Sequence, residues 1–156
     1  MSFSDWLDAK IRTLLTEEAG AFADSARGKA PTGRIRGNIE VGQVRKDGGR
    51  YSIEVSVSLK KAPEAGAYEY GSGIHATRGT PGTYPIVAKN APNLVFWWEK
   101  KDKWFVGSSV NHPGVAARPY LAPAVKERRR SLIRRILFAF KEGVNVAVKE
   151  ATTGKL

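Results

Sequence analysis

The stretch that decides the fold of this chain is His112-Pro113-Gly114-Val115-Ala116-Ala117-Arg118-Pro119-Tyr120-Leu121-Ala122-Pro123-Ala124. Pro119 fixes its own φ angle and drives Arg118 towards an extended conformation. Pro123 stands in the first turn of the expected helix, where a proline is tolerated. The stretch therefore predicts a stiff extended arm that ends abruptly in a helix. Such an arm sets the angle between two elements, which is typical of an assembly protein rather than of a catalytic loop.

The helix that follows the arm is expected from Tyr120 to Lys149. Apolar residues recur along it every four residues or a multiple of four, which places them on one helical face. We expect this stripe to face the sheet or a partner; its members are Leu121, Val125, Leu132, Ile136, Phe140, Val144 and Val148.

A second helix is expected near the N-terminus, from Ser4 to Arg27. Its apolar positions share one face, while Glu17 and Glu18 lie mostly off it. Gly28 can terminate the helix, and Pro31 prevents its continuation. An Arg-rich linker is expected next, over residues 31–38.

Two hairpins are predicted between the helices. The first has strands near residues 39–45 and 51–59, joined by Lys46-Asp47-Gly48-Gly49, in which Asp-Gly favours a type I′ turn. The second has strands at residues 94–98 and from Trp104 onward, joined by a lysine-rich turn. The fold class is therefore α+β, an antiparallel sheet of two hairpins packed against the N-terminal helix and the long basic C-terminal helix.

One domain is expected over residues 1–156, because this length suits a single core. Residues 72–85 are expected to form an extended Gly/Pro loop that is too long for a simple connection, so we expect it to contact another subunit or a neighbouring ring and to become ordered only there. The tail, residues 151–156, is expected to be disordered.

The charge of the chain is strongly positive, with 26 Lys and Arg against 15 Asp and Glu, a formal net charge of +11. Such a charge indicates a polyanionic neighbour, which can be nucleic acid, an acidic protein surface or anionic lipid. The alternative is a set of merely solvated basic residues. Cys is absent, which excludes disulfides and thiolate chemistry. No apolar run approaches the roughly 20 residues that cross a bilayer.

Catalytic chemistry has little support in the sequence. His75 and His112 stand beside loop signals, without a second His or a carboxylate at ligand spacing. Glu64 and Glu69 flank a loop, and no glycine-rich phosphate cradle is present. We expect no enzymatic activity, no catalytic residue, no metal and no cofactor.

The basic clusters are the stronger functional signal. Six basic residues and one carboxylate lie between Lys126 and Arg135, early in a helix where the macrodipole disfavours cations. A partner of opposite charge explains this arrangement, whereas a solvated helix face is the alternative. The expected contacts with DNA in a channel, or with an acidic partner, are Arg34, Arg36, Lys126, Arg129, Arg130 and Arg134. Trp97, Trp98 and Trp104 beside lysines suit base stacking, but adjacent tryptophans in a hairpin alternate between core and surface.

Three short motifs resemble a family of tailed-phage proteins, which holds neck, head–tail joining and tail-completion proteins, including relatives of the lambda minor tail protein Z. The motifs occur in the order found in that family: Ala30-Pro31-Thr32-Gly33-Arg34-Ile35-Arg36, then Ala67-Tyr68-Glu69-Tyr70-Gly71-Ser72, then His112-Pro113-Gly114 with Ala117-Arg118-Pro119-Tyr120-Leu121 and Pro123-Ala124. The resemblance spans residues 4–140. It differs in a shortened linker, in Ile35 where Leu is usual, and in a longer segment over residues 74–111.

The resemblance implies a structural virion protein without enzymatic activity. It would form a homo-oligomeric ring, six-fold or twelve-fold, at the head–tail junction, assembled in the host bacterial cytoplasm. Its partners would be other copies, a head-closure or adaptor ring, a tail terminator or tail tube, and genomic DNA bound non-specifically in the channel, with no membrane. The expected subunit interface comprises Tyr68, Glu69, Tyr70, Gly71, His75, Trp98, His112, Arg118, Pro119 and Tyr120. The alternative function is a stand-alone, non-specific nucleic-acid-binding module that uses the basic C-terminal helix.

Overall fold

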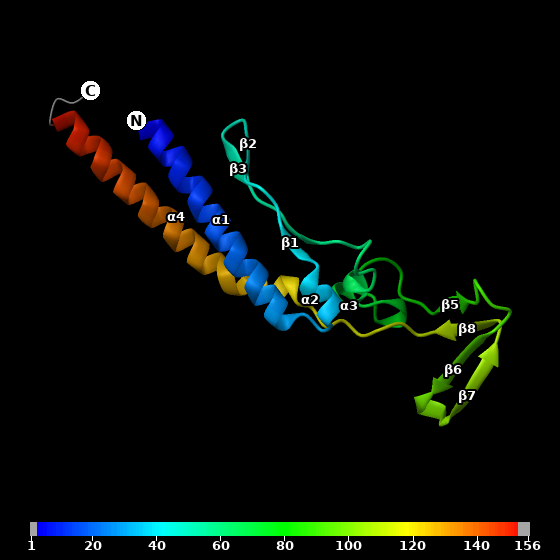
Figure 1. Cartoon of the computed structure of the whole chain (residues 1–156). Coiled ribbons are helices and arrows are strands. Elements are labelled where there is room, and N and C mark those ends of the chain that lie inside the picture. The colour runs from blue at the N-terminus through cyan, green and yellow to red at the C-terminus, as the bar shows by residue number, and fades with distance from the viewer. Residues whose placement is uncertain (1–2, 153–156) are drawn as a thin grey trace. The chain divides into compact units, whose positions relative to one another are not determined.

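The computed structural model describes residues 3–152 and confirms the α+β class (Figure 1). Within these residues four α-helices and eight strands form, and the strands make four separate two-stranded antiparallel sheets rather than one sheet. Two compact units are distinguished, residues 3–65 with 119–152 (unit 1) and residues 66–118 (unit 2). We describe each unit by itself, and the expectation of a single domain stays a prediction.

Two long helices form the body of unit 1. Helix α1 (Phe3–Lys29) and helix α4 (Leu121–Thr152) run antiparallel along most of their length (Figure 1). Both helices were predicted from the sequence. Ala151 and Thr152, expected in a disordered tail, belong to α4, while the rest of that tail lies outside the described residues.

The side of α4 that faces α1 differs from the predicted apolar stripe. The residues buried there are small, namely Ala124, Ala139 and Gly143. A Cβ atom at Gly143 would stand 2.7 Å from the Trp6 ring, so these helices approach as closely as their side chains allow. Most of the predicted stripe is half exposed, including Val125, Phe140, Val144 and Val148. At these positions the stripe does not face a sheet of unit 1, because small residues provide the close contact within the unit; a stripe that faces a partner stays a prediction.

The segment expected as an Arg-rich linker contains helix α2 (Gly33–Gly37). Thr32 caps it, since its hydroxyl accepts a hydrogen bond from the Ile35 amide at 3.2 Å. Ile35 is fully buried and ties this short helix to the core of unit 1. A linker was therefore the wrong expectation, because a capped helix needs only one good N-cap and one buried anchor.

The predicted first hairpin forms two short sheets in unit 1. Strands β1 (Ile39–Val41) and β4 (Val55–Val57) pair, and strands β2 (Arg45–Asp47) and β3 (Arg50–Ser52) pair beyond them. Gly48 and Gly49 both adopt positive φ, as a type I′ turn requires, so the turn lies one residue after the expected Asp-Gly. Asp8 of α1 anchors the β2–β3 hairpin, because its carboxylate accepts hydrogen bonds from Lys46 at 2.7 Å and Tyr51 at 2.6 Å.

Unit 2 contains the other two sheets. Strands β6 (Leu94–Trp98) and β7 (Lys103–Gly107) form the predicted second hairpin, joined through the 3-10 turn η2 (Glu99–Lys101). Strands β5 (Tyr84–Val87) and β8 (Ser109–His112) pair outside it and were not predicted. The second motif, residues 67–72, lies mostly in helix α3 (Ala65–Tyr70), whose first residue is the last residue of the first segment of unit 1.

The expected loop at residues 72–85 is partly anchored. It contains the 3-10 turn η1 (Gly73–His75), and its end enters β5. The amide of Ser72 donates to Val115 and that of Ile74 to Pro113, which fastens the loop to the stretch after β8. A Cβ atom at Gly114 would overlap the Ser72 carbonyl oxygen, so only glycine fits there. No helix in the described part of the chain is long and apolar enough to cross a membrane.

Candidate functional site: the basic outer face of helix α4

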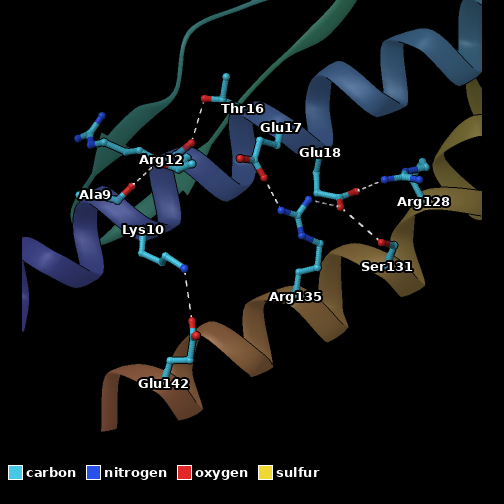
Figure 2. Close-up of polar contacts among 11 residues, drawn as sticks. Ala9, Lys10, Arg12, Thr16, Glu17, Glu18, Arg128, Ser131, Arg135 and Glu142 are labelled. Carbon is cyan, nitrogen blue, oxygen red and sulfur yellow. Dashed lines mark hydrogen bonds and ion pairs between the residues drawn. The ribbon is translucent and has the colours of Figure 1, made fainter. Parts of the chain in front are cut away.

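A buried carboxylate organises the arginines of α4. Glu18 of α1 is 4% exposed and accepts hydrogen bonds from Arg128 at 3.0 Å and from Arg135 at 2.8 Å (Figure 2). Ser131 adds a third bond at 3.4 Å, and Arg135 also pairs with Glu17. The cluster locks α4 against α1, because removing any member leaves a charge with fewer partners.

The titration of Glu18 follows from two opposing effects. Burial alone raises the pKa of its carboxyl group, but the hydrogen bonds and charges of Arg135 and Arg128 outweigh burial and lower that pKa below its ordinary value. The same bond network raises the pKa of Arg135. Glu18 therefore stays ionised at neutral pH, and the inward arginines are balanced within the unit.

Further ion pairs repeat the pattern along both helices. Lys29 contacts Glu127 at 2.6 Å near one end of the pair, and Lys10 contacts Glu142 at 3.3 Å near the other (Figure 2). The carboxylate of Glu127 is thus engaged by α1, and the lowered pKa of Glu127, caused first by the hydrogen bond from Lys29, agrees with this. Both of these α4 carboxylates therefore balance cations of α1.

Four cations of α4 remain on its outer surface. Lys126, Arg129, Arg130 and Arg134 are exposed, and none forms an ion pair with another described residue. Steps of four along a helix place Lys126, Arg130 and Arg134 close to one line. The six basic residues of this segment thus divide into two that pair inward with Glu18 and four that point a concentrated positive charge outward.

The two other arginines predicted to contact DNA lie on α2. Arg34 stands 3.8 Å from Glu64, too long for a hydrogen bond, and Arg36 donates to the Arg27 carbonyl at 3.2 Å. Both are exposed, yet each has a partner inside unit 1. The structure places them on a different element from the α4 cluster, so the predicted set of six is divided between two elements.

The predicted interface residues occupy varied environments. Tyr120 is 1% exposed and Glu69 is 7% exposed, so both are buried. Arg118 donates its amide to the Tyr68 carbonyl at 2.7 Å, closing the base of unit 2, and Tyr70 carries Arg78 over its ring. Their assignment to a subunit interface, together with that of Gly71, His75 and Pro119, stays a prediction.

The histidines differ in their surroundings. His75 is exposed, at the end of η1. His112 is half-buried, and its Nδ1 atom accepts a hydrogen bond from the Gly114 amide at 2.9 Å. This side chain therefore caps its own turn, as expected for a residue before Pro-Gly. Among residues 3–152, no group of three His, Asp or Glu side chains gathers as metal ligands do.

The tryptophans of the β6–β7 hairpin differ in exposure, and the assignment of Trp98 to a subunit interface stays a prediction. Trp98 is half-buried and packs against Phe96 in a tilted geometry and against Phe105 edge to face, at ring centroid distances of 6.1 and 5.7 Å. Trp97 and Trp104 pair across the hairpin on its opposite face and are exposed. The alternation of adjacent tryptophans was expected, but the sequence does not tell which of the two faces is packed.

Comparison with known proteins points to tailed phages. The model of a family described as "Bacteriophage HK97-gp10, putative tail-component" matches residues 1–72, so this part of the chain is similar to that family. The match agrees with the resemblance to phage neck and tail-completion proteins. No curated protein and no solved structure matches the chain.

Proposed function

We propose that this chain is a structural subunit of a ring at the head–tail junction of a tailed phage, a neck or tail-completion protein. It would join or complete heads and tails and let the genome pass through its channel. The supporting observations are the tail-component family match and the row of outward cations on α4, which no carboxylate of the described chain neutralises. The ring would be closed and cyclic, six-fold or twelve-fold, because closed symmetry satisfies every subunit contact.

The outward cations suit a passing duplex. Lys126, Arg129, Arg130 and Arg134 can neutralise phosphates without reading bases, and a channel needs contacts that let DNA slide. The isolated protein is expected to bind duplex DNA weakly at physiological salt, roughly in the 10⁻⁴–10⁻⁶ M range of non-specific binders. The stand-alone nucleic-acid-binding module is the second candidate, because the same cations support it.

Assembly separates the two candidates. The chain is expressed with the products of its neighbouring reading frames and inspected by light scattering and negative-stain electron microscopy. Closed rings, alone or joined to tail or connector components, support the proposal. A protein that stays monomeric with every neighbour, and binds one duplex with nanomolar affinity at about 200 mM salt, refutes it and favours the stand-alone module.

Charge variants then test the role of α4. Replacing Arg129, Arg130 and Arg134 with Gln is expected to flatten the log–log salt dependence of binding by about 0.9 for each phosphate that is no longer neutralised. The matched control removes three exposed cations elsewhere in unit 1, Arg45, Arg50 and Lys60. If both triple variants lose affinity equally, binding follows net charge and not the α4 face.

A further inference from the structure

The second half of α4 carries an apolar seam on its outer side. The seam consists of Ile133, Leu137, Phe140, Val144 and Val148, each between 47% and 64% exposed. The steps between them are four, three, four and four residues, which keeps them in a narrow double row on one helical face. Such a row is the arrangement by which one helix receives another.

Nothing in the described part of unit 1 covers this seam. Helix α1 lies along the other side of α4, against Ala139 and Gly143 (Figure 1). The seam extends over 16 residues, about 24 Å of helix. Large apolar side chains gathered over such a length mark an interaction surface, whereas single exposed apolar residues need no explanation.

Cations alone border the seam. Arg134 and Lys141 lie three or four residues from Leu137, and Arg130 lies three residues before Ile133. These three side chains are exposed and form no ion pair with the described residues. The carboxylates of Glu127 and Glu142 point toward α1 rather than toward the seam, since Glu127 pairs with Lys29 and Glu142 with Lys10.

The cations beside the seam indicate which kind of partner it binds. A second copy of α4 would bring further cations and no described carboxylate to the flanks of this seam, so it would leave these cations without partners of opposite charge. The chain also has few carboxylates to offer, because eight of its 15 already pair with its own cations: Asp8, Glu17, Glu18, Asp24, Glu40, Glu64, Glu127 and Glu142. Duplex DNA would satisfy the cations and leave the apolar row exposed to water.

We propose that the α4 seam binds an amphipathic helix of a different protein, with apolar residues at heptad spacing and Asp or Glu at the flanking positions. The apolar row of that helix would cover Leu137, Phe140 and Val144, and its carboxylates would meet Arg134 and Lys141. The apolar row supplies the affinity, and the flanking charges supply orientation and partner choice. This binding surface shares Arg134 with the proposed DNA contacts, but it does not depend on ring closure, so it stands whether or not the ring forms.

The first test uses designed peptides of about three heptads and the full chain. The probe has Leu at the a and d positions and Glu at e and g, and it is labelled for fluorescence anisotropy. One control peptide carries Lys at e and g, and another keeps Glu but has Ser at a and d. Of the three peptides, we expect only the Leu/Glu peptide to bind. Equal binding of the Ser/Glu peptide would mean that net charge explains the signal and would overturn the proposal.

Variants of the seam complete the test. Leu137→Ser with Phe140→Ser is expected to weaken the Leu/Glu peptide by roughly tenfold or more, while Leu59→Ser, also in unit 1 and 61% exposed, leaves binding unchanged. Because the altered side chains are exposed, circular dichroism should show an unchanged melting temperature. Arg134→Glu with Lys141→Glu is expected to transfer preference to the Leu/Lys peptide.

Three outcomes would refute this assignment. Peptide binding that survives Leu137→Ser with Phe140→Ser places the site elsewhere. Self-association of the parent that the same variant abolishes, seen by sedimentation, assigns the seam to a second copy. Co-sedimentation with vesicles of anionic and zwitterionic phospholipid, abolished in the variant, assigns it to a membrane surface.

Discussion

Replacing Glu18 with Gln tests whether the buried ion cluster holds the two long helices together. Gln keeps the volume of the side chain and removes its charge, so Arg128 loses the only ion pair that it forms with the described residues, and its Nε atom already lacks a hydrogen-bond partner among them. Breaking a fully buried pair costs about 3–5 kcal/mol. Both arginine side chains are about one third exposed and can regain water, so we expect a loss of about 2 kcal/mol.

Thermal and urea unfolding, followed by circular dichroism at 222 nm, measure the effect. For a folded unit of about 100 residues, such as unit 1, a loss of 2 kcal/mol in unfolding free energy corresponds to a fall of roughly 8–16 °C in the melting temperature. Glu17→Gln is the matched control, because Glu17 is half exposed and contacts the same Arg135. It should cost no more than about 1 kcal/mol. If the two variants lose equal stability, the cluster contributes no more than a surface pair and the reasoning is wrong.

The pH dependence gives an independent check. The pKa of Glu18 is lower in the folded state than its ordinary value of 4.5, so its contribution is fully present above pH 4.5 and disappears as pH falls through the folded pKa. The difference in unfolding free energy between parent and Glu18→Gln should therefore be constant near neutral pH and shrink in acid. A difference that grows on acidification would contradict the lowered pKa.

Three further tests, which use five substitutions, have clear expected outcomes. Gly114→Ala should melt unit 2, seen as loss of amide protection in hydrogen exchange, whereas Gly79→Ala, also at positive φ but with open space around it, should cost only about 1–2 kcal/mol. Gly20→Ala should raise the unfolding free energy by up to about 1 kcal/mol, whereas Gly143→Ala should not raise it, because its new methyl group meets two aromatic rings. Equal gains in unfolding free energy would show that the two helices are not in close contact at Gly143. Asp8→Asn should raise hydrogen exchange across the β2–β3 hairpin at neutral pH. In the parent the hairpin should loosen only in strong acid, because hydrogen bonds from Lys46, Tyr51 and Arg12 lower the pKa of Asp8. Unchanged exchange in the variant would show that Asp8 does not anchor the hairpin.

The elements with strong local signals were predictable from the sequence. The two long helices follow from sustained 3.6-residue periodicity, and the hairpins follow from glycine turns between alternating apolar runs. Strand β5 was missed because Pro85 argues against a strand. The proline is tolerated there because both strands of a two-stranded sheet are edge strands, so its missing N–H can face away from the partner strand. Strand β8 was missed because Asn111 and His112 are poor strand formers.

The facing of α4 could not be predicted from periodicity alone. Large apolar residues and small residues both recur along it at helical spacing, so periodicity left open whether the large residues face the rest of the chain or a partner. The discriminating signal was present in Gly143 and in the aromatic pair of Phe3 and Trp6, which fit one another only at close approach. Glu18 was likewise placed off the packed face, because a single carboxylate gives no sign of the arginines that will surround it.

The small residues between α1 and α4 have a consequence for how this protein can change. Because Ala139 and Gly143 make the contact and Glu18 fixes its register, the bulky side chains of the outer face contribute little to holding the unit together. Substitutions at Leu137 or Phe140 can therefore accumulate without a folding penalty, so that partner preference drifts while the scaffold persists. Two chains that share the inner residues and differ along the outer row would then be interchangeable in shape and incompatible in assembly.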